Sequence, residues 1–286
     1  MKKSELKTPL IKKAGELNWV LGVFLVALGV AICNRADLGI SMIAAPAFIL
    51  ADAVHPLWNG FTVGMAEYLV QGLIVIITCL ICWRFDWRYL LSFLTAVIYG
   101  YVVDMWMLII GTEPFAELWL RWVILIVGDI VTCIGVAFFF RSYLPVEAYE
   151  LCVHEVARVH KLNMHHVKWV FDFSCLAVSI ILAFSIFGDA TTFDWATIYT
   201  HSFHHIGLGT IVTTLISAPL ISMASALLRN LFGEEPLFEP IHKLLLIGNK
   251  LSKKGDAPSE PGDNDNTSED APLADLEFPH TDTNEE

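Results

Sequence analysis

The chain has 286 residues, of which 55% are hydrophobic and 17% charged, and its mean hydropathy is +0.58. Soluble domains carry about 25% charged residues, so the composition excludes an ordinary soluble domain and predicts an integral membrane protein. The net charge of -12 is uneven, because residues 255–286 hold 11 of the 30 acidic residues and no Lys or Arg. Residues 1–254 are therefore nearly neutral, which excludes a basic nucleic-acid-binding domain.

Six stretches are long and apolar enough to cross a membrane, since a spanning helix needs about 20 mostly apolar residues. They are residues 18–36, 60–83, 89–110, 118–141, 167–187 and 205–228. The first follows a basic segment, residues 1–17, as in a signal peptide. No small-residue cleavage site follows it, and five more spans do. We therefore predict an uncleaved anchor and an all-α integral membrane protein with six transmembrane helices.

The Lys and Arg residues predict the orientation, because positive residues stay on the cytoplasmic side. With the N-terminus inside, only Arg35 and Arg121 of the 18 basic residues lie outside. We expect a multi-pass protein of the bacterial inner membrane with both termini in the cytoplasm and the lipid bilayer around it.

The two halves of the chain, residues 18–116 and 117–230, resemble each other. Residues 29–39 align with residues 135–145 at a shift of 106, with five of eleven positions identical, and the match pairs Arg35 with Arg141. Three spans per half is an odd number, so the halves would enter the membrane from opposite sides, as in the inverted repeats of secondary transporters. The alternative is chance similarity between hydrophobic segments.

Each half also contains a short element after its first span. Residues 39–51, with Gly39, Ser41 and Pro46, are apolar but too short to span. Residues 145–160 begin at Pro145, a favourable first position of a helix. We predict two short re-entrant or interfacial helices whose positive N-terminal ends could face an anionic group.

The last two segments lie beyond the spans. Residues 231–254 include a stretch, residues 237–254, with apolar and basic residues at helical spacing, which predicts an amphipathic helix on the membrane surface. Residues 255–286 have too few apolar residues to fold, so we expect a disordered acidic tail. The tail is either a partner-binding or regulatory segment or a solubilising extension.

Four carboxylates lie within otherwise apolar spans: Glu67, Asp104, Asp129 and Asp172. Placing a carboxylate at mid-membrane costs about 2.5–3.5 kcal/mol on the insertion scale, so such a residue needs a partner or a function. At a shift of 105, Glu67 aligns with Asp172. We predict proton or cation coupling through these carboxylates, Glu67 and Asp172 first. The alternative is a hydrogen bond or ion pair that holds helices together.

Two groups of His and acidic residues have helical spacing that suits a metal ion. They are Glu147, Glu150 and His154 in the second short helix, and His201, His204 and His205 before the last span. The first group, with Arg158, is equally an exposed run of charge pairs, which we prefer. No catalytic signature is present, so we expect neither an enzyme nor a cofactor.

Three segments carry a family resemblance: residues 36–50 (ADLGISMIAAPAFIL), the run from Gly60 to Gln71, and residues 144–172. They resemble YczE/YitT-type bacterial integral membrane proteins over about residues 20–228, with Asp37, Leu38 and Gly39 matching an Ala-Asp-Leu-Gly-like motif. The second motif departs from the family, with Pro145 and Glu147 in place of Gly-rich sequence. Because some members are suspected of export, the resemblance implies transport.

The sequence therefore favours a secondary transporter or permease of an unidentified small solute or ion. One alternative is a non-transporting membrane protein that recruits a partner protein, and another is a divalent-metal permease. A second copy of the chain is a further candidate partner.

Overall fold

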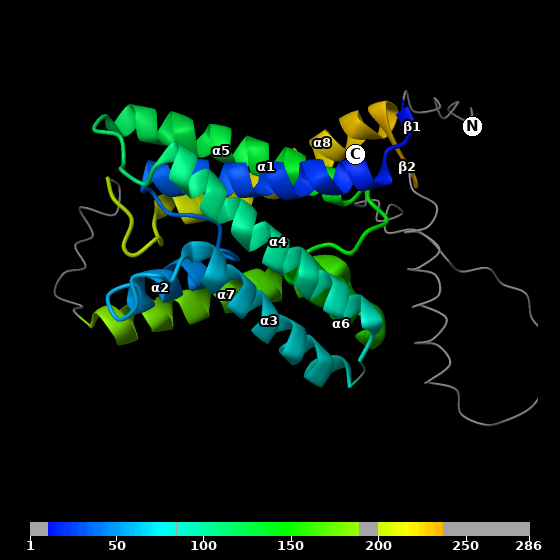
Figure 1. The fold of residues 1–286 in the computed structure, drawn as a ribbon, viewed down its shortest axis with the longest axis horizontal. Helices are drawn as coiled ribbons and strands as arrows, with labels where there is room; N and C mark the ends of the chain where they lie inside the picture. The colour runs from blue at the N-terminus through cyan, green and yellow to red at the C-terminus, as the bar shows by residue number, and fades with distance from the viewer. Residues whose placement is uncertain (1–10, 84, 189–199, 237–286) are drawn as a thin grey trace, which may run out of the picture.

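The computed structural model describes residues 11–83, 85–188 and 200–236, and in these ranges the chain forms eight helices and two short strands (Figure 1). Six helices can cross a membrane by length and composition. They are α1 (Gly15–Ala36), α3 (Val63–Cys82), α4 (Trp87–Ile110), α5 (Leu118–Phe139), α7 (Met164–Phe187) and α8 (Leu208–Leu231). Two shorter helices, α2 (Ala45–Val54) and α6 (Ala148–His160), follow α1 and α5. The predicted all-α membrane fold with six spans is confirmed.

Local sequence explains where several helices begin and end. The Thr62 hydroxyl accepts a hydrogen bond from the backbone N–H of Met65 (3.2 Å) at the start of α3. At the start of α4, the Asp86 carboxylate accepts one from the N–H of Arg88 (3.0 Å). These caps satisfy N–H groups that have no partner inside the helix. Helix α1 ends at Ala36, and its C-cap residue Asp37 has a left-handed φ of +50°.

The centre of the bundle is an antiparallel pair, α1 and α5, which lie side by side along the long axis (Figure 1). A Cβ on Gly29 would lie 2.6 Å from both the carbonyl oxygen of Gly128 and the backbone nitrogen of Thr132. Further along, Gly22 meets the carbonyl oxygen of Gly135. Early residues of α1 thus face late residues of α5. Small residues at this seam let the two backbones touch, which is how helices gain van der Waals contact in a membrane.

Helix α4 joins this pair to α3. It packs against α1, α3 and α6, and Figure 1 shows it crossing between them. Gly64 of α3 and Gly100 of α4 touch, so that a Cβ on Gly100 would lie 2.5 Å from the Gly64 carbonyl oxygen.

Helices α7 and α8 lie at the outside of the bundle. Only 17% of the α7 span and 11% of the α8 span is buried within the described protein, against 50% of the α1 span. Large apolar side chains such as Ile181 and Leu215 are exposed on them, as expected of a lipid-facing surface.

The two flanks of the bundle meet in a small parallel sheet of β1 (Ile11–Lys13) and β2 (Phe232–Glu235). The Asn18 side chain supports it by donating to the carbonyl oxygens of Gly233 (3.0 Å) and Arg141 (2.8 Å). This pairing places both flanks at one end of the bundle, as an even number of spans requires. The predicted helix at residues 231–254 is thus wrong at residues 232–235, whose backbone pairs with β1. Residues 237–254 and the tail at 255–286 lie outside the described residues.

Candidate functional site

A buried polar cluster lies where α3 meets the start of α6. Glu67 and Gln71 are one turn apart on α3, Glu147 is the N-cap residue of α6, and Tyr149 is in its first turn. Glu67 and Gln71 are fully buried, and Glu147 is 7% exposed. We call these four residues the carboxylate cluster.

Two hydrogen bonds join the two helices across the cluster. The Tyr149 hydroxyl donates to Oε2 of Glu67 (2.9 Å), and the backbone N–H of Ala148 donates to Oε1 of Gln71 (3.1 Å). The second bond gives an orphan N–H at the start of α6 its partner. The cluster is therefore part of how α6 docks on α3.

Three atoms of the cluster form no hydrogen bond with any residue that the structure describes: Oε1 of Glu67, Oε1 of Glu147 and Nε2 of Gln71. The ion pairs of the described residues include neither Glu67 nor Glu147. Burial raises the pKa of Glu147 well above its usual value, and the nearby Glu67 and Glu150 raise it further. Burial and Glu67 likewise raise the pKa of Tyr149. A buried carboxyl without a cation is one that binds a proton readily.

The extended residues before α6 hold Glu147 in place. The carbonyl oxygen of Pro145 accepts hydrogen bonds from Thr95 (3.0 Å) and Trp19 (3.2 Å), and that of Val146 accepts one from Ser92 (2.6 Å). Because these carbonyls bond sideways to α1 and α4, the helix begins at Ala148. The prediction that it begins at Pro145 is wrong for this reason. Helix α2 likewise begins later than predicted, at Ala45, where the Ser41 carbonyl oxygen accepts from two N–H groups.

Asp172 lies in a different environment from Glu67, although the two align in sequence. Its carboxylate pairs with Lys168 (3.2 Å), one turn earlier on α7, and Lys168 also approaches Glu150 (3.8 Å). Asp172 therefore has a cation beside it, which it shares with Glu150. Glu67 instead lies near Glu147, whose pKa its charge raises.

The other two carboxylates within spans act between helices. Asp104 accepts hydrogen bonds from the Thr62 hydroxyl (2.6 Å) and the Gly64 N–H (2.7 Å), which ties α4 to the start of α3. Asp129 of α5 accepts one from the Ser217 hydroxyl of α8 (3.0 Å), and its other oxygen has no hydrogen-bond partner among the described residues.

The two aligned arginines each cap another helix. Arg35 donates to the carbonyl oxygen of Ile110 (2.6 Å), the last residue of α4. Arg141 donates to the carbonyl oxygen of Phe232 (2.8 Å), the C-cap of α8. A cation at a helix C-terminus satisfies carbonyls that lack a partner and opposes the negative end of the helix dipole.

The three histidines before the last span lie in an irregular segment, because α8 begins only at Leu208. The predicted helical grouping is therefore wrong. His201 contacts Asp37 (2.9 Å), His205 contacts Asp52 (2.9 Å), and His204 stacks on Phe187. The three side chains thus engage separate partners.

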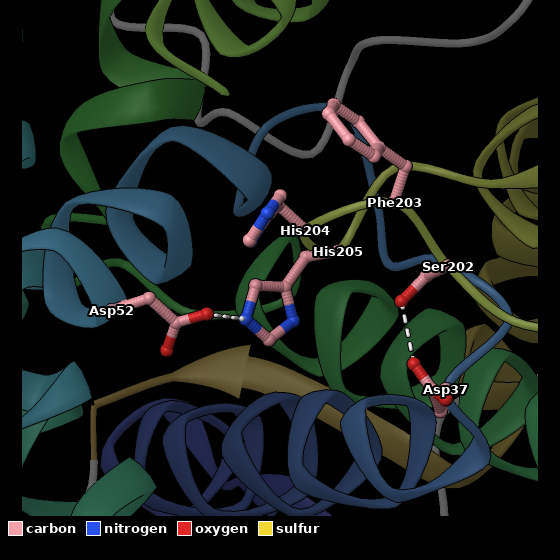
Figure 2. A pocket seen from close by; sticks show the side chains of 6 residues that line it. All are labelled: Asp37, Asp52, Ser202, Phe203, His204 and His205. Carbon is pink, nitrogen blue, oxygen red and sulfur yellow. Dashed lines mark hydrogen bonds and ion pairs between the residues drawn. The ribbon is translucent and has the colours of Figure 1, made fainter. Parts of the chain in front are cut away.

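A shallow pocket of about 400 Å³ opens at this segment. Figure 2 shows its lining, with His205 bonded to Asp52 and Ser202 bonded to Asp37. Nearby, Gly39 has a φ of +105°, and a Cβ there would lie 2.6 Å from the backbone nitrogen of Gly207. Only glycine fits at position 39, because both its positive φ and the close contact with Gly207 exclude a side chain. The contact joins the loop after α1 to the start of α8.

The first proposed metal group also separates. Arg158 pairs with Glu155 (2.5 Å), Glu150 faces Lys168, and His154 approaches Glu155. The expected run of i, i+4 charge pairs does not form, because Glu155 pairs with Arg158 and lies closest to His154. Within residues 11–83, 85–188 and 200–236, no three His, Cys, Asp or Glu side chains are grouped to hold a metal ion.

Sequence reasoning found Glu67 but not its partners. Gln71 lies one turn after Glu67 in an apolar span, a spacing that could have drawn attention to it. Nothing in the sequence pairs Glu67 with Tyr149 or Glu147, because these contacts join residues about 80 positions apart.

These features define a helical membrane protein with six spans and a buried polar site between helices. The chain belongs to a family of unknown function, DUF6198, whose sequence profile matches residues 14–226. No curated protein and no solved structure matched the chain.

Proposed function

We propose that the protein is a secondary transporter of a small solute, coupled to a proton or another cation, in the bacterial inner membrane with both termini in the cytoplasm. The carboxylate cluster is the observation that carries this proposal. Glu67 and Gln71 come from the first half of the chain, whereas Glu147 and Tyr149 come from the second half. Secondary transporters place substrate and ion sites at the junction of their two repeats.

The α1–α5 seam supports an inverted repeat. Gly29 meets Thr132, and applying the shift of 106 to both positions predicts that Gly135 meets Val26, which is a contact in the structure. The contact of Gly29 with Gly128 predicts in the same way the contact of Gly135 with Gly22. A twofold axis in the membrane plane that exchanges the halves would produce both pairs of contacts.

The arginine caps support the same symmetry. Arg35 belongs to the first helix of its half and caps the last helix of that half, α4. Arg141 lies two residues after the end of α5, the first helix of the second half, and caps the last helix of that half, α8. Chance similarity between hydrophobic segments predicts no such shared role.

The helix contacts add an asymmetry that alternating access would require. Two contacts in one half have a counterpart in the other. The contact of α2 with α7 corresponds to that of α6 with α3, and the contact of α1 with α4 corresponds to that of α5 with α8. In contrast, α3 packs on α4, whereas α7 and α8 are not among the helix pairs in substantial contact in the described part of the chain. Exchange of these two arrangements between the halves would open the cluster to opposite sides of the membrane.

The resemblance of three segments to YczE/YitT-type proteins supports transport. The divalent-metal alternative gains no support from the described residues. The partner-recruiting alternative depends mainly on residues 237–286, which lie outside them.

Spin-label distances test the proposed conformational exchange without knowledge of the substrate. Labels replace the exposed residues Ile181 of α7 and Ile211 of α8 in a variant without native cysteines. We expect two distance populations in lipid nanodiscs, in proportions that change with pH or with Glu67→Gln. A control pair at Phe24 and Ile130, on the α1–α5 unit, should give one distance. A single unchanging distance between α7 and α8 would count against alternating access.

Transport itself is tested in proteoliposomes that contain a pH-sensitive dye. Pools of amines, amino acids, nucleosides and lipophilic cations are added under an imposed pH gradient. A transporter produces solute-dependent movement of protons or of the coupled cation, and Glu67→Gln abolishes it. Glu155→Gln is the matched control, because Glu155 is a buried carboxylate of α6 that pairs with Arg158 instead. If no pool produces a response, the partner-recruiting alternative is favoured.

A further inference from the structure

We infer that Glu67 and Glu147 together hold one proton, and that this proton is the ion to which transport is coupled. That this proton is the coupling ion rests on the proposed transport function. The occupancy of the pair by one proton stands on the geometry of the carboxylate cluster.

Two carboxyl groups lie near each other, and no ion pair among the described residues includes either of them. Both side chains are buried, and each has one oxygen without a donor. The charge of Glu67 acts on Glu147. Two like charges so placed cannot both ionise at low cost, so a coupled pair gives up its protons in two well-separated steps.

The surroundings favour one negative charge but not two. The Tyr149 hydroxyl donates to Glu67, which stabilises an ionised carboxylate there. Gln71 is a hydrogen-bonding neighbour of both carboxyl groups, and its buried Nε2 forms no close, well-aligned bond that commits it to one of them. A donor placed beside both groups is suited to whichever carboxylate is ionised while the other carries the proton.

In the part of the chain that the structure describes, the titratable groups that act on the pair add no positive charge. Those that face it are Tyr149 and Glu150 from α6 and Tyr99 from α4. Lys168 of α7 is engaged by Glu150 and Asp172. Asp52 of α2 bonds to His205, and Asp104 of α4 bonds to Thr62 and Gly64.

The ligand count argues for a proton over a metal cation. Hard cations such as Ca²⁺ and Mg²⁺ take six or more oxygen ligands. The cluster has two carboxylate oxygens without a hydrogen-bond partner, Oε1 of Glu67 and Oε1 of Glu147. The Gln71 oxygen already accepts a hydrogen bond, and the Tyr149 hydroxyl already donates one. A proton needs one of these oxygens alone, and it exchanges with bulk water as the cluster opens.

Infrared titration of the protein in nanodiscs tests the inference directly, because a protonated carboxyl group has its own carbonyl stretch. We expect wild type to show such a band at neutral pH that is absent from the Glu67→Gln/Glu147→Gln double variant. In Glu67→Gln, Glu147 should bind its proton about tenfold more weakly, because the like charge that raises its pKa is gone. Glu155→Gln should titrate as wild type does.

Two results would overturn the inference. One is a wild-type spectrum at neutral pH without a protonated carboxyl that the double variant removes. The other is a band that Na⁺ removes while an equal concentration of choline leaves it unchanged, which would assign the site to a metal cation. Glu147→Gln, with Glu67 followed instead, replaces Glu67→Gln if that variant does not fold. Neither measurement depends on transport, so a failed transport assay leaves the protonation result intact.

Discussion

The seam between α1 and α5 allows a stability prediction that also tests the repeat. In Gly29→Ala, the new Cβ would lie 2.6 Å from the Gly128 carbonyl oxygen and from the Thr132 nitrogen. Both are backbone atoms of α5 and cannot rotate away, so α5 must shift by about 0.8 Å to restore an ordinary contact. Overpacking of this kind costs about 1–3 kcal/mol, and we expect the upper end of that range.

The matched variant is Gly135→Ala, whose Cβ would lie 2.6 Å from the Val26 nitrogen on α1. If the halves are related by the shift of 106, its cost should equal that of Gly29→Ala within about 0.5 kcal/mol. Gly72→Ala is the control, because its Cβ would meet the end of the Phe93 ring, which can turn aside. The assay is denaturant unfolding in mixed micelles, with far-UV circular dichroism as the signal. Equal and mild effects in all three variants would refute the reasoning.

Three further predictions concern the carboxylate cluster and the helix caps. Tyr149→Phe leaves Oε2 of Glu67 without its donor, so the free energy of unfolding should fall by about 1–3 kcal/mol, and an unchanged value would mean that another donor replaces the hydroxyl. Arg141→Ala removes the donor to Phe232 at the end of α8 and should cost about 1 kcal/mol, whereas Arg141→Lys should recover part of it; the same unfolding assay measures both. Because burial raises the pKa of Glu147, the folded state binds more protons than the unfolded state, so stability falls as pH rises above the ordinary glutamate value. Melting temperatures measured from pH 5 to 8 should therefore decline less in Glu147→Gln than in wild type, and parallel curves would contradict this assignment.

The spans were predictable because the length and composition of each apolar segment are enough to identify it as a membrane-spanning helix. About 20 apolar residues in a row are costly anywhere but in lipid or a core, and the helices lie close to the predicted stretches. The short helix after each half's first span was predictable for the converse reason, since α2 and α6 are too short to cross. Their starting residues were not, because side chains of other helices bind the backbone before them.

The candidate site was predictable only in part. A lone carboxylate in an apolar span identified Glu67, but the same signal identified Asp172 and Asp104, which have partners of their own. The three histidines have helical spacing, yet they precede the helix. Helical spacing places side chains on one face only if the segment is a helix. Contacts with distant parts of the chain decide whether it is one.

The sequence by itself determined that this chain crosses a membrane six times, that its flanks lie on one side, and that a few carboxylates need an explanation. Each of these follows from the cost of moving single residues or segments from water into lipid. Only the tertiary structure decided which carboxylate has a cation, which lies beside another carboxylate, and which ties two helices together. Glu67 and Asp172 align in sequence, but one meets Tyr149 and the other Lys168. The chemistry of a buried charge depends on what packs within a few ångströms of it, and those neighbours come from distant parts of the chain.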